Sequence, residues 1–141
     1  MDNTFNLHFG GSISDANRGD LPSYCGIYLV YRGVYNKEKN NFACRVIIYI
    51  GQADNINDRH KNHEKRAAFL AKCGKDEIIF YSYVKVDKYY LDRVENALVF
   101  KMCPSLNDKL TQTFPYDETT IVSDGACALL NKNFTLQRKD Q

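Results

Sequence analysis

The sequence predicts an α+β fold: a small central antiparallel sheet of about three strands, flanked by helices in the order β-β-α-β-α, with a short C-terminal extension. Three observations lead to this prediction. Two runs of β-branched and aromatic residues lie close together in the first third of the chain, separated by a polar turn. A segment with helical spacing of its apolar residues follows them. A third strand-like run and a second helical segment complete the pattern.

The first two strands are predicted at Cys25–Tyr35 and Cys44–Tyr49, where residues that favour extended backbone are concentrated. The polar stretch 36–41 between them has the composition of a turn. We therefore expect an antiparallel hairpin with a long loop over Asn36–Phe42.

The next three elements, two helices and a strand, are predicted from the spacing of apolar residues and from the residues that end a helix. A single helix is expected over residues 57–73, because its apolar residues recur at helical spacing and Gly74 is a natural stop. Alternating residues predict a third strand at Ile78–Val86. A second helix is expected over Tyr89–Met102, ended by Pro104.

The remaining segments flank this core, which spans residues 21–107. Residues 1–20 are polar and predict a loosely structured lead-in with one short strand around Phe5–Phe9. Residues 108–141 are expected to pack on the core as an extension, so that the chain forms a single domain. Two short strands are expected in that extension, at Thr119–Val122 and Phe134–Gln137.

Bulk composition is that of an ordinary globular protein, with 44% hydrophobic and 26% charged residues. The sequence contains no run of about 18 apolar residues, which a membrane-spanning helix needs. The first residues have neither the basic start nor the apolar stretch of a signal peptide, so we expect an intracellular, cytoplasmic protein. The five cysteines are scattered and form no C-x-x-C pair, which argues against a disulfide framework or a zinc knuckle.

Positive charge is concentrated in one stretch, residues 58–75, which holds six Lys or Arg against two acidic residues. A local basic surface is what a polyanionic partner would contact. A solvated helix face would have the same composition. If the partner is a nucleic acid, the candidate phosphate-binding residues are Lys61, Lys65, Arg66 and Lys72.

Two tripeptides on the predicted hairpin carry the most specific signal. Gly26-Ile27-Tyr28 lies on the first strand, and Tyr49-Ile50-Gly51 ends the second. Arg59 follows Tyr49 by ten positions, and His63 comes four residues later. Glu95 lies within the second predicted helix, which is followed by a segment that runs from Pro104 to Asn107. Over about residues 21 to 107 the chain resembles the GIY-YIG nuclease family, in which these residue types recur in this order.

One departure from the family pattern concerns the hairpin. Tyr28 and Tyr49 are further apart in the sequence than the two tyrosines usually are in that family. We expect the long loop over Asn36–Phe42 to absorb the excess, because a loop can lengthen at little free-energy cost.

The resemblance implies a phosphodiester-cleaving site. Glu95 would supply one hard oxygen ligand for a single Mg²⁺ (or Mn²⁺) ion held mostly by water and substrate. Arg59 would bind the phosphate through its charged fork. Tyr28 is the preferred general base, supported by Tyr49 and His63. Asn107 would position the phosphate or a neighbouring side chain. Each of these residues also has an ordinary structural reading, since strand tyrosines are often half-buried and a helical histidine or glutamate is usually solvated.

The function expected from this site is a metal-dependent endonuclease that hydrolyses nucleic acid, with DNA preferred as the substrate and RNA left open, for example in DNA repair or restriction. Two alternatives stay open. The chain could be a nucleic-acid-binding module with weak or no cleavage, or a nuclease subunit that needs a partner. Because the residues after Asn107 are too few to form an independent domain, target choice would come from short insertions, self-association or a targeting protein.

Overall fold

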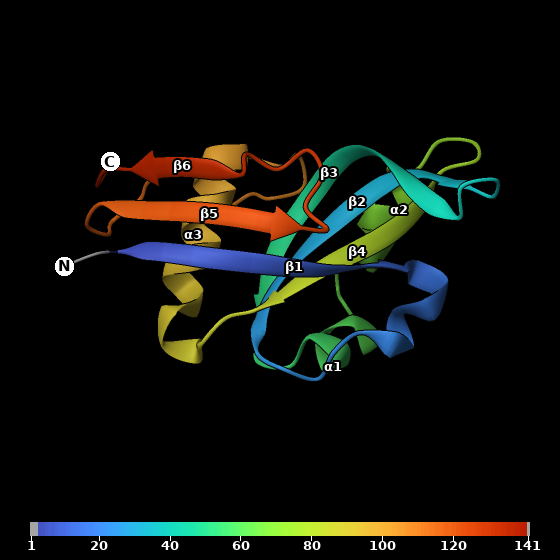
Figure 1. Cartoon of the computed structure of the whole chain (residues 1–141), viewed down its shortest axis with the longest axis horizontal. Helices are drawn as coiled ribbons and strands as arrows, with labels where there is room; N and C mark the ends of the chain where they lie inside the picture. The colour runs from blue at the N-terminus through green and yellow to red at the C-terminus, as the bar shows by residue number, and fades with distance from the viewer. Residues whose placement is uncertain (1–2, 141) are drawn as a thin grey trace.

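A computed structural model describes residues 3–140 of the chain. Within these residues six strands form one sheet in the order β3-β2-β4-β1-β5-β6. The strands β2, β3 and β4 run at an angle to β1, β5 and β6 (Figure 1). The strands are β1 (Thr4–Ser14), β2 (Gly26–Asn36), β3 (Asn41–Ala53), β4 (Ile78–Lys85), β5 (Thr119–Gly125) and β6 (Asn133–Leu136).

Within the described residues, three α-helices and two short 3-10 helices connect these strands. A 3-10 helix, η1, follows β1, and a second, η2, leads directly into the longest helix, α3. Two short helices, α1 and α2, lie between β3 and β4. Their bounds are η1 (Asp15–Asp20), α1 (Ile56–Lys61), α2 (Arg66–Ala71), η2 (Lys88–Tyr90) and α3 (Leu91–Met102).

The predicted fold class is wrong in the size and type of the sheet. A small three-stranded antiparallel sheet was expected, whereas the sheet has six strands in the described residues and is mixed, because β1 and β5 pair in parallel. The strands β2, β3 and β4 make up only one side of it. The segment expected to be a loose lead-in forms β1, which lies between β4 and β5 in the middle of the sheet.

The hydrophobic pattern of β1 explains its place. Phe5, Leu7 and Phe9 alternate with polar residues, and Leu7 and Phe9 are buried. Alternation of this kind indicates a strand with one buried face. Beyond it, β5 and β6 extend the sheet to its far edge, close to where two short strands were predicted in the C-terminal extension. These contacts join both ends of the chain to the sheet.

The hairpin is longer and its loop shorter than expected. Strand pairing continues to Asn36 on β2 and resumes at Asn41 on β3, so that only four residues, 37–40, turn the chain. The aromatic pair Tyr35 and Phe42 stands at the end of this ladder, with ring centroids 5.5 Å apart. The extra separation between Tyr28 and Tyr49 is therefore taken up by longer strands rather than by a loop.

Each face of the β2–β3–β4 half supports a separate core. Ile27 and Leu29 of β2 belong to a large cluster with Val94 and Leu98 of α3. The alternate residues on β2 belong to a second cluster, together with Phe69 of α2. Successive side chains on a strand point to opposite faces, which explains why one strand contributes to both clusters.

The single helix expected over residues 57–73 is interrupted. The helix α1 ends at Lys61, and Asn62 leaves helical geometry with φ −152° and ψ 56° before α2 begins at Arg66. His63 therefore lies in the connection and not one helical turn after Arg59. No helix within residues 3–140 is both long and apolar enough to cross a membrane.

Candidate functional site

The pairing of β2 with β3 places the two motif tyrosines on one face of the sheet. Tyr28 is opposite Gly51 and Val30 is opposite Tyr49, so the two tyrosines are diagonal neighbours across the ladder. Their ring centroids are 6.3 Å apart. The register changes by one residue just beyond Tyr49, where Ile47 rather than Ile48 is opposite Tyr31. An extra residue of this kind re-aims the side chains on either side of it.

Gly51 is required by the position of Tyr28. A β-carbon at Gly51 would overlap the phenol ring and the hydroxyl oxygen of Tyr28. Such an overlap cannot be relieved cheaply, because the Tyr28 ring is itself buried. The last residue of the second tripeptide therefore makes room for the last residue of the first.

Tyr28 and His63 form a buried hydrogen bond whose direction can be assigned. The backbone N–H of Lys65 donates to His63 Nδ1 over 3.0 Å, so in the neutral ring the proton is on Nε2. His63 Nε2 then donates to the Tyr28 hydroxyl oxygen over 2.7 Å. Burial, followed by the nearby charge of Arg59, lowers the pKa of His63 to about 4, which keeps the ring neutral near pH 7.

His60 packs behind this pair as part of the aromatic cluster. Its ring centroid is 4.3 Å from that of Tyr28 and 4.6 Å from that of Tyr81. Burial, with the neighbouring His63, lowers the pKa of His60 to about 3. His60 Nε2 has no hydrogen-bond partner among the residues described. This histidine is therefore a neutral, space-filling member of the core below the site.

The two tyrosines differ in their access to solvent. Tyr28 is 1% exposed, and burial raises the pKa of its phenol well above the usual value. Tyr49 is only partly buried, and its hydroxyl makes no hydrogen bond within residues 3–140. Burial also raises the pKa of Tyr49, and the charge of Glu95 adds to that rise. Of the two phenol groups, that of Tyr49 is the one that reaches solvent.

Arg59 lies at the end of α1 and forms an ion pair with Glu64. Its Nη2 donates to Glu64 Oε1 over 2.8 Å, and this contact raises the pKa of the guanidinium. The same hydrogen bond lowers the pKa of Glu64 to about 2. The charge of Arg59 also acts on both Tyr28 and Tyr49. The guanidinium is thus close to the tyrosines, but an exposed carboxylate occupies part of its fork.

Glu95 projects from α3 toward β3. Its Oε1 accepts a hydrogen bond of 2.8 Å from Gln52 Nε2, and the same amide donates to Asp92 Oδ1 over 2.7 Å. Burial raises the pKa of Glu95, and the charge of Asp92 adds to the rise. The backbone of Gln52 contributes a further hydrogen bond to this carboxylate, and both contacts with Gln52 act to lower the pKa of Glu95. Gln52 therefore fixes the Glu95 carboxylate in its place at the wall of a pocket.

Asn107 is bonded to the backbone of the motif strand. Its Oδ1 accepts from the Ile50 N–H over 3.0 Å, and its Nδ2 donates to the Ile50 carbonyl over 2.9 Å. Both ends of the side-chain amide are thereby occupied by one residue of β3. The structure places Asn107 as a clamp on the strand between Tyr49 and Gly51, rather than as a group free to hold a phosphate.

A pocket of about 360 Å³ brings several of these residues together. Tyr49 comes from β3, Glu95 from α3, and Glu64 and Lys65 from the connection between α1 and α2. Tyr28 and His63 lie behind it, in contact with Tyr49. The full lining is Tyr49, Glu64, Lys65, Glu95, Asn107, Asp108, Lys109 and Leu110.

The donor set of this pocket fits a cation that has one protein ligand. No group of three or more His, Cys, Asp and Glu side chains able to hold a metal occurs in residues 3–140. A closed cage such as a structural zinc site is therefore not built here. Mg²⁺ keeps most of its waters and commonly takes one or two carboxylates plus substrate phosphate. The Glu95 carboxylate, which lines the pocket, meets that requirement.

The four residues predicted to bind nucleic acid differ in their environments. Arg66 is committed to Asp15, with Nη2–Oδ2 2.7 Å and Nε–Oδ1 3.2 Å, and thereby ties α2 to η1. Lys61 pairs with Asp58 at 2.9 Å. Lys65 lines the pocket, with its ammonium 5.8 Å from the Tyr49 ring centroid and 4.0 Å from Asp108. Lys72 is exposed at the end of α2.

Two residues of the site were missed in the sequence. Gln52 directly follows the second tripeptide on β3, and its side-chain amide orients Glu95, which lies on α3. Glu64 directly follows His63 and pairs with Arg59. Spacing could reveal neither residue. The Arg59–Glu64 ion pair spans five residues across an interrupted helix, and Gln52 is 43 residues from Glu95, so neither contact leaves a periodic signal.

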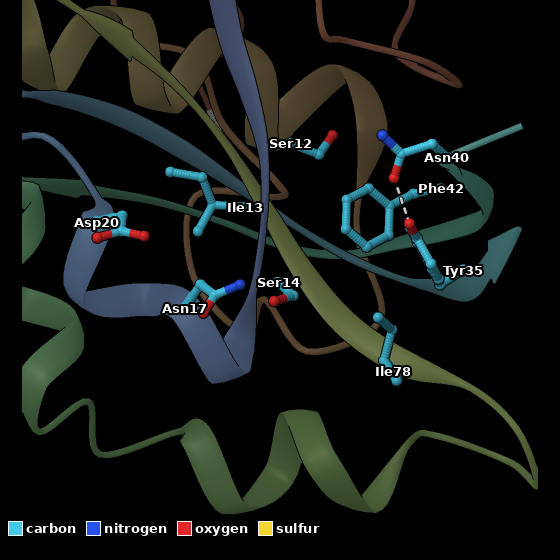
Figure 2. Close-up of a pocket in the computed structure, with 9 residues that line it drawn as sticks. All are labelled: Ser12, Ile13, Ser14, Asn17, Asp20, Tyr35, Asn40, Phe42 and Ile78. Atoms are coloured by element: carbon cyan, nitrogen blue, oxygen red, sulfur yellow. Dashed lines mark hydrogen bonds between the residues drawn. The ribbon is translucent and has the colours of Figure 1, made fainter. Parts of the chain in front are cut away.

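A second hollow, shown in Figure 2, is separate from this pocket. It measures about 530 Å³ and lies between the end of β1, η1, β4 and the far end of the β2–β3 hairpin. A hydrogen bond from the Tyr35 hydroxyl to Asn40 crosses one side of it (Figure 2). None of its lining residues is one of those predicted for the site, and Asp20 is its one charged side chain.

Comparisons of the chain with protein-family models, with curated proteins and with solved structures find no match in any of the three. The functional argument therefore depends on the geometry of the pocket and on the resemblance of the motifs.

Proposed function

We propose that the chain is a metal-dependent endonuclease of the GIY-YIG type that hydrolyses phosphodiester bonds in DNA. One observation carries the proposal. Tyr49, Glu95 and Lys65, from three separate parts of the fold, line one pocket, with Arg59 held beside it by Glu64. A phenol, a carboxylate and two cations around one hollow are the groups that phosphate-ester hydrolysis uses. An intracellular setting, where DNA is the substrate, belongs to the same proposal.

Glu95 is the residue proposed to hold the metal ion. A bound Mg²⁺ would neutralise phosphate charge and lower the pKa of the attacking water. Gln52 holds the Glu95 carboxylate in place at the wall of the pocket, where a cation would meet it. Burial raises the pKa of this carboxyl, and a divalent cation would favour the ionised form. Gln52 is a positioning residue in this arrangement.

Arg59 is proposed to bind the phosphate. Its planar guanidinium can form paired hydrogen bonds to phosphate oxygens, and its charge persists at every physiological pH. In the free protein Glu64 occupies part of that fork, so a phosphate has to replace this carboxylate. Because Glu64 is exposed, it can swing into solvent at little cost in buried surface.

The two tyrosines are proposed to have different roles. The partly exposed hydroxyl of Tyr49 is better placed than that of Tyr28 to orient or deprotonate the attacking water. Tyr28 was the preferred base in the sequence, but its hydroxyl is buried and accepts a hydrogen bond from His63. Tyr28 and His63 would then hold the Tyr49 ring in position through their ring contacts.

A second candidate function is a nuclease subunit that needs a partner. The Arg59–Glu64 ion pair favours it, because any partner that binds Glu64 would release the guanidinium. Such a partner, or a second copy of the chain, would also supply target choice. The two proposals differ in whether the purified chain is active alone.

The test is cleavage of supercoiled plasmid and of branched DNA by the purified chain with Mg²⁺ or Mn²⁺, with and without chelator. Glu95→Gln is expected to slow cleavage at least about a hundredfold, because the metal loses its charged ligand. Arg59→Lys keeps the charge but loses the fork, and about a tenfold loss is expected. The control is Glu38→Gln, in the exposed hairpin turn.

Cleavage that persists in Glu95→Gln at the wild-type rate would overturn the proposal. Activity in the purified wild-type chain would exclude the partner-dependent reading. If the purified chain binds DNA but cuts only after addition of a cell extract, the second candidate is favoured. Binding should weaken as salt concentration rises, because phosphate contacts release counterions.

A further inference from the structure

We infer that Leu110 is an apolar wedge that contacts a base next to the bond that is cut. The preferred substrate would then be DNA whose base stacking is already interrupted at that point, such as a flap or a junction. This inference rests on the proposed nuclease function and names the substrate class of the same pocket. It starts from the loop that forms one wall of that pocket, residues 107–113.

The loop is fixed by the helix that carries the proposed metal ligand. Asn96 directly follows Glu95 on α3 and is 3% exposed. Its Nδ2 donates to the Leu110 carbonyl over 3.1 Å and to the Thr113 carbonyl over 3.0 Å. A buried amide committed to two loop carbonyls holds the loop in one conformation. Glu95 and Asn96, the residue that holds the Leu110 loop, are therefore neighbours on a single helix.

The conformation and exposure of Leu110 are both unfavourable in the free protein. Its backbone has φ 66°, a left-handed conformation that a leucine rarely adopts. Its side chain is 41% exposed, although it borders a pocket. Outliers of this kind persist where the surrounding structure enforces them, and they concentrate at functional sites. The loop thus keeps an apolar side chain at the mouth of the pocket.

The neighbours of Leu110 suggest what it meets. Lys65 and Lys109 line the same pocket, and their ammonium groups suit the phosphates of a bound strand. An apolar side chain beside such contacts can bury its surface only against a base face or a sugar. Leucine is one of the residues that proteins insert between base steps, where it unstacks them.

The free-energy cost of unstacking selects the substrate. Separating two stacked base pairs in an intact duplex costs a few kcal/mol, and the cost is lowest where a base is already unpaired or mismatched. A flap or junction supplies such a step at the branch point. A single leucine on a small domain would therefore gain most from branched DNA.

The experiment compares wild type, Leu110→Ala and Leu129→Ala on two DNA substrates of the same sequence, one fully paired and one with a flap. Leu129 is a matched control, because it is also exposed, at 52%, and also left-handed, with φ 67°. It borders a different hollow, which is lined by residues 45–47 of β3 and by residues 102–105 at the end of α3. A 2-aminopurine beside the branch point reports unstacking by its fluorescence, in chelator as well as in Mg²⁺.

Wild type and Leu129→Ala are expected to cut the flap at least about tenfold faster than the duplex, the effect of burying one leucine side chain. Leu110→Ala should lose this preference and the fluorescence rise, whereas Leu110→Phe should keep both. Equal cutting of the two substrates by wild type, or an unchanged preference in Leu110→Ala, would overturn the wedge while leaving the nuclease proposal intact. A Leu110-dependent fluorescence rise without any cleavage would support the wedge and overturn the proposal that the purified chain cuts DNA alone. Neither fluorescence change nor cleavage would overturn both.

Discussion

The two faces of the β2–β3–β4 half of the sheet are formed by the same strands but bury different kinds of side chain. Toward α3, Ile27 and Leu29 pack against the buried aliphatic residues of that helix. Toward α1 and α2, Tyr28 packs against His60 and His63, which are both buried and neutral. One face is a hydrocarbon core, and the other encloses groups that can exchange protons.

The difference shows how one small sheet supports two tasks. The face toward α3 gains free energy from every buried methyl group and keeps the strands rigid. The face toward α1 and α2 holds polar groups in a dry environment, which costs stability but shifts their pKa values. If this division is correct, substitutions on the first face should change stability alone, and those on the second should change pH dependence and chemistry.

The largest effect is expected on the face toward α3. Leu98→Ala removes a fully buried side chain from α3 and should lower the free energy of unfolding by about 3 kcal/mol through lost burial and a residual cavity. Urea unfolding measures this, with Leu129→Ala as an exposed control that should change it by less than about 0.5 kcal/mol. Equal losses in both variants would contradict the core assignment.

The next effect concerns acid pH and the face toward α1 and α2. Folding lowers the pKa of His63 to about 4 and that of His60 to about 3, whereas an unfolded histidine titrates near 6.5. Between these values the unfolded chain binds more protons, so stability is fully present above pH 6.5 and is lost as the pH falls toward 4. The loss should be roughly 3 kcal/mol for His63 alone.

Urea unfolding between pH 7 and pH 4 measures this slope. His63→Asn should reduce it, because the substituted side chain does not titrate. His8→Asn is the control, since His8 is exposed and pairs with Asp124 at 2.8 Å between β1 and β5, in the other half of the sheet. A slope that is unchanged in His63→Asn would mean that carboxylates alone cause the acid sensitivity.

The smallest stability effects, and the sharpest contrast, come from the two tyrosines. Tyr28→Phe leaves the buried Nε2–H of His63 without an acceptor and should cost about 1–2 kcal/mol of stability. Tyr49→Phe removes a hydroxyl that reaches solvent, so its stability should change by less than about 0.5 kcal/mol. Cleavage should nevertheless fall most in Tyr49→Phe, as measured by single-turnover assays. The reverse order of cleavage would favour Tyr28 as the base.

The local elements of this fold could be predicted from sequence, but their assembly could not. The strands of the hairpin and the helix α3 are evident from residue type and periodicity. β1 was predicted only in part, around Phe5–Phe9, because Gly10 and Gly11 interrupt its pattern. Its place between β4 and β5 depends on pairing across the whole chain, which no local pattern encodes.

The site shows the same division. The tripeptides, Arg59 and Glu95 were predicted from the order and spacing in which they resemble the GIY-YIG family. The break at Asn62, which lets His63 reach Tyr28, is a tertiary effect that overrides helical periodicity. The partners that orient the site, such as Gln52 for Glu95, come from elements distant in sequence, and a hydrogen bond between them leaves no periodic trace.

The amide of Asn107 has a consequence beyond the pocket. β3 is at one edge of the sheet, and an edge strand exposes backbone groups that can recruit a strand from another molecule. The Asn107 side chain binds both backbone groups of Ile50, and the Leu106 N–H donates to the Ile48 carbonyl over 3.0 Å. The residues that hold the motif strand in place thereby imitate a neighbouring strand, and they protect this stretch of the edge from self-association into fibrils.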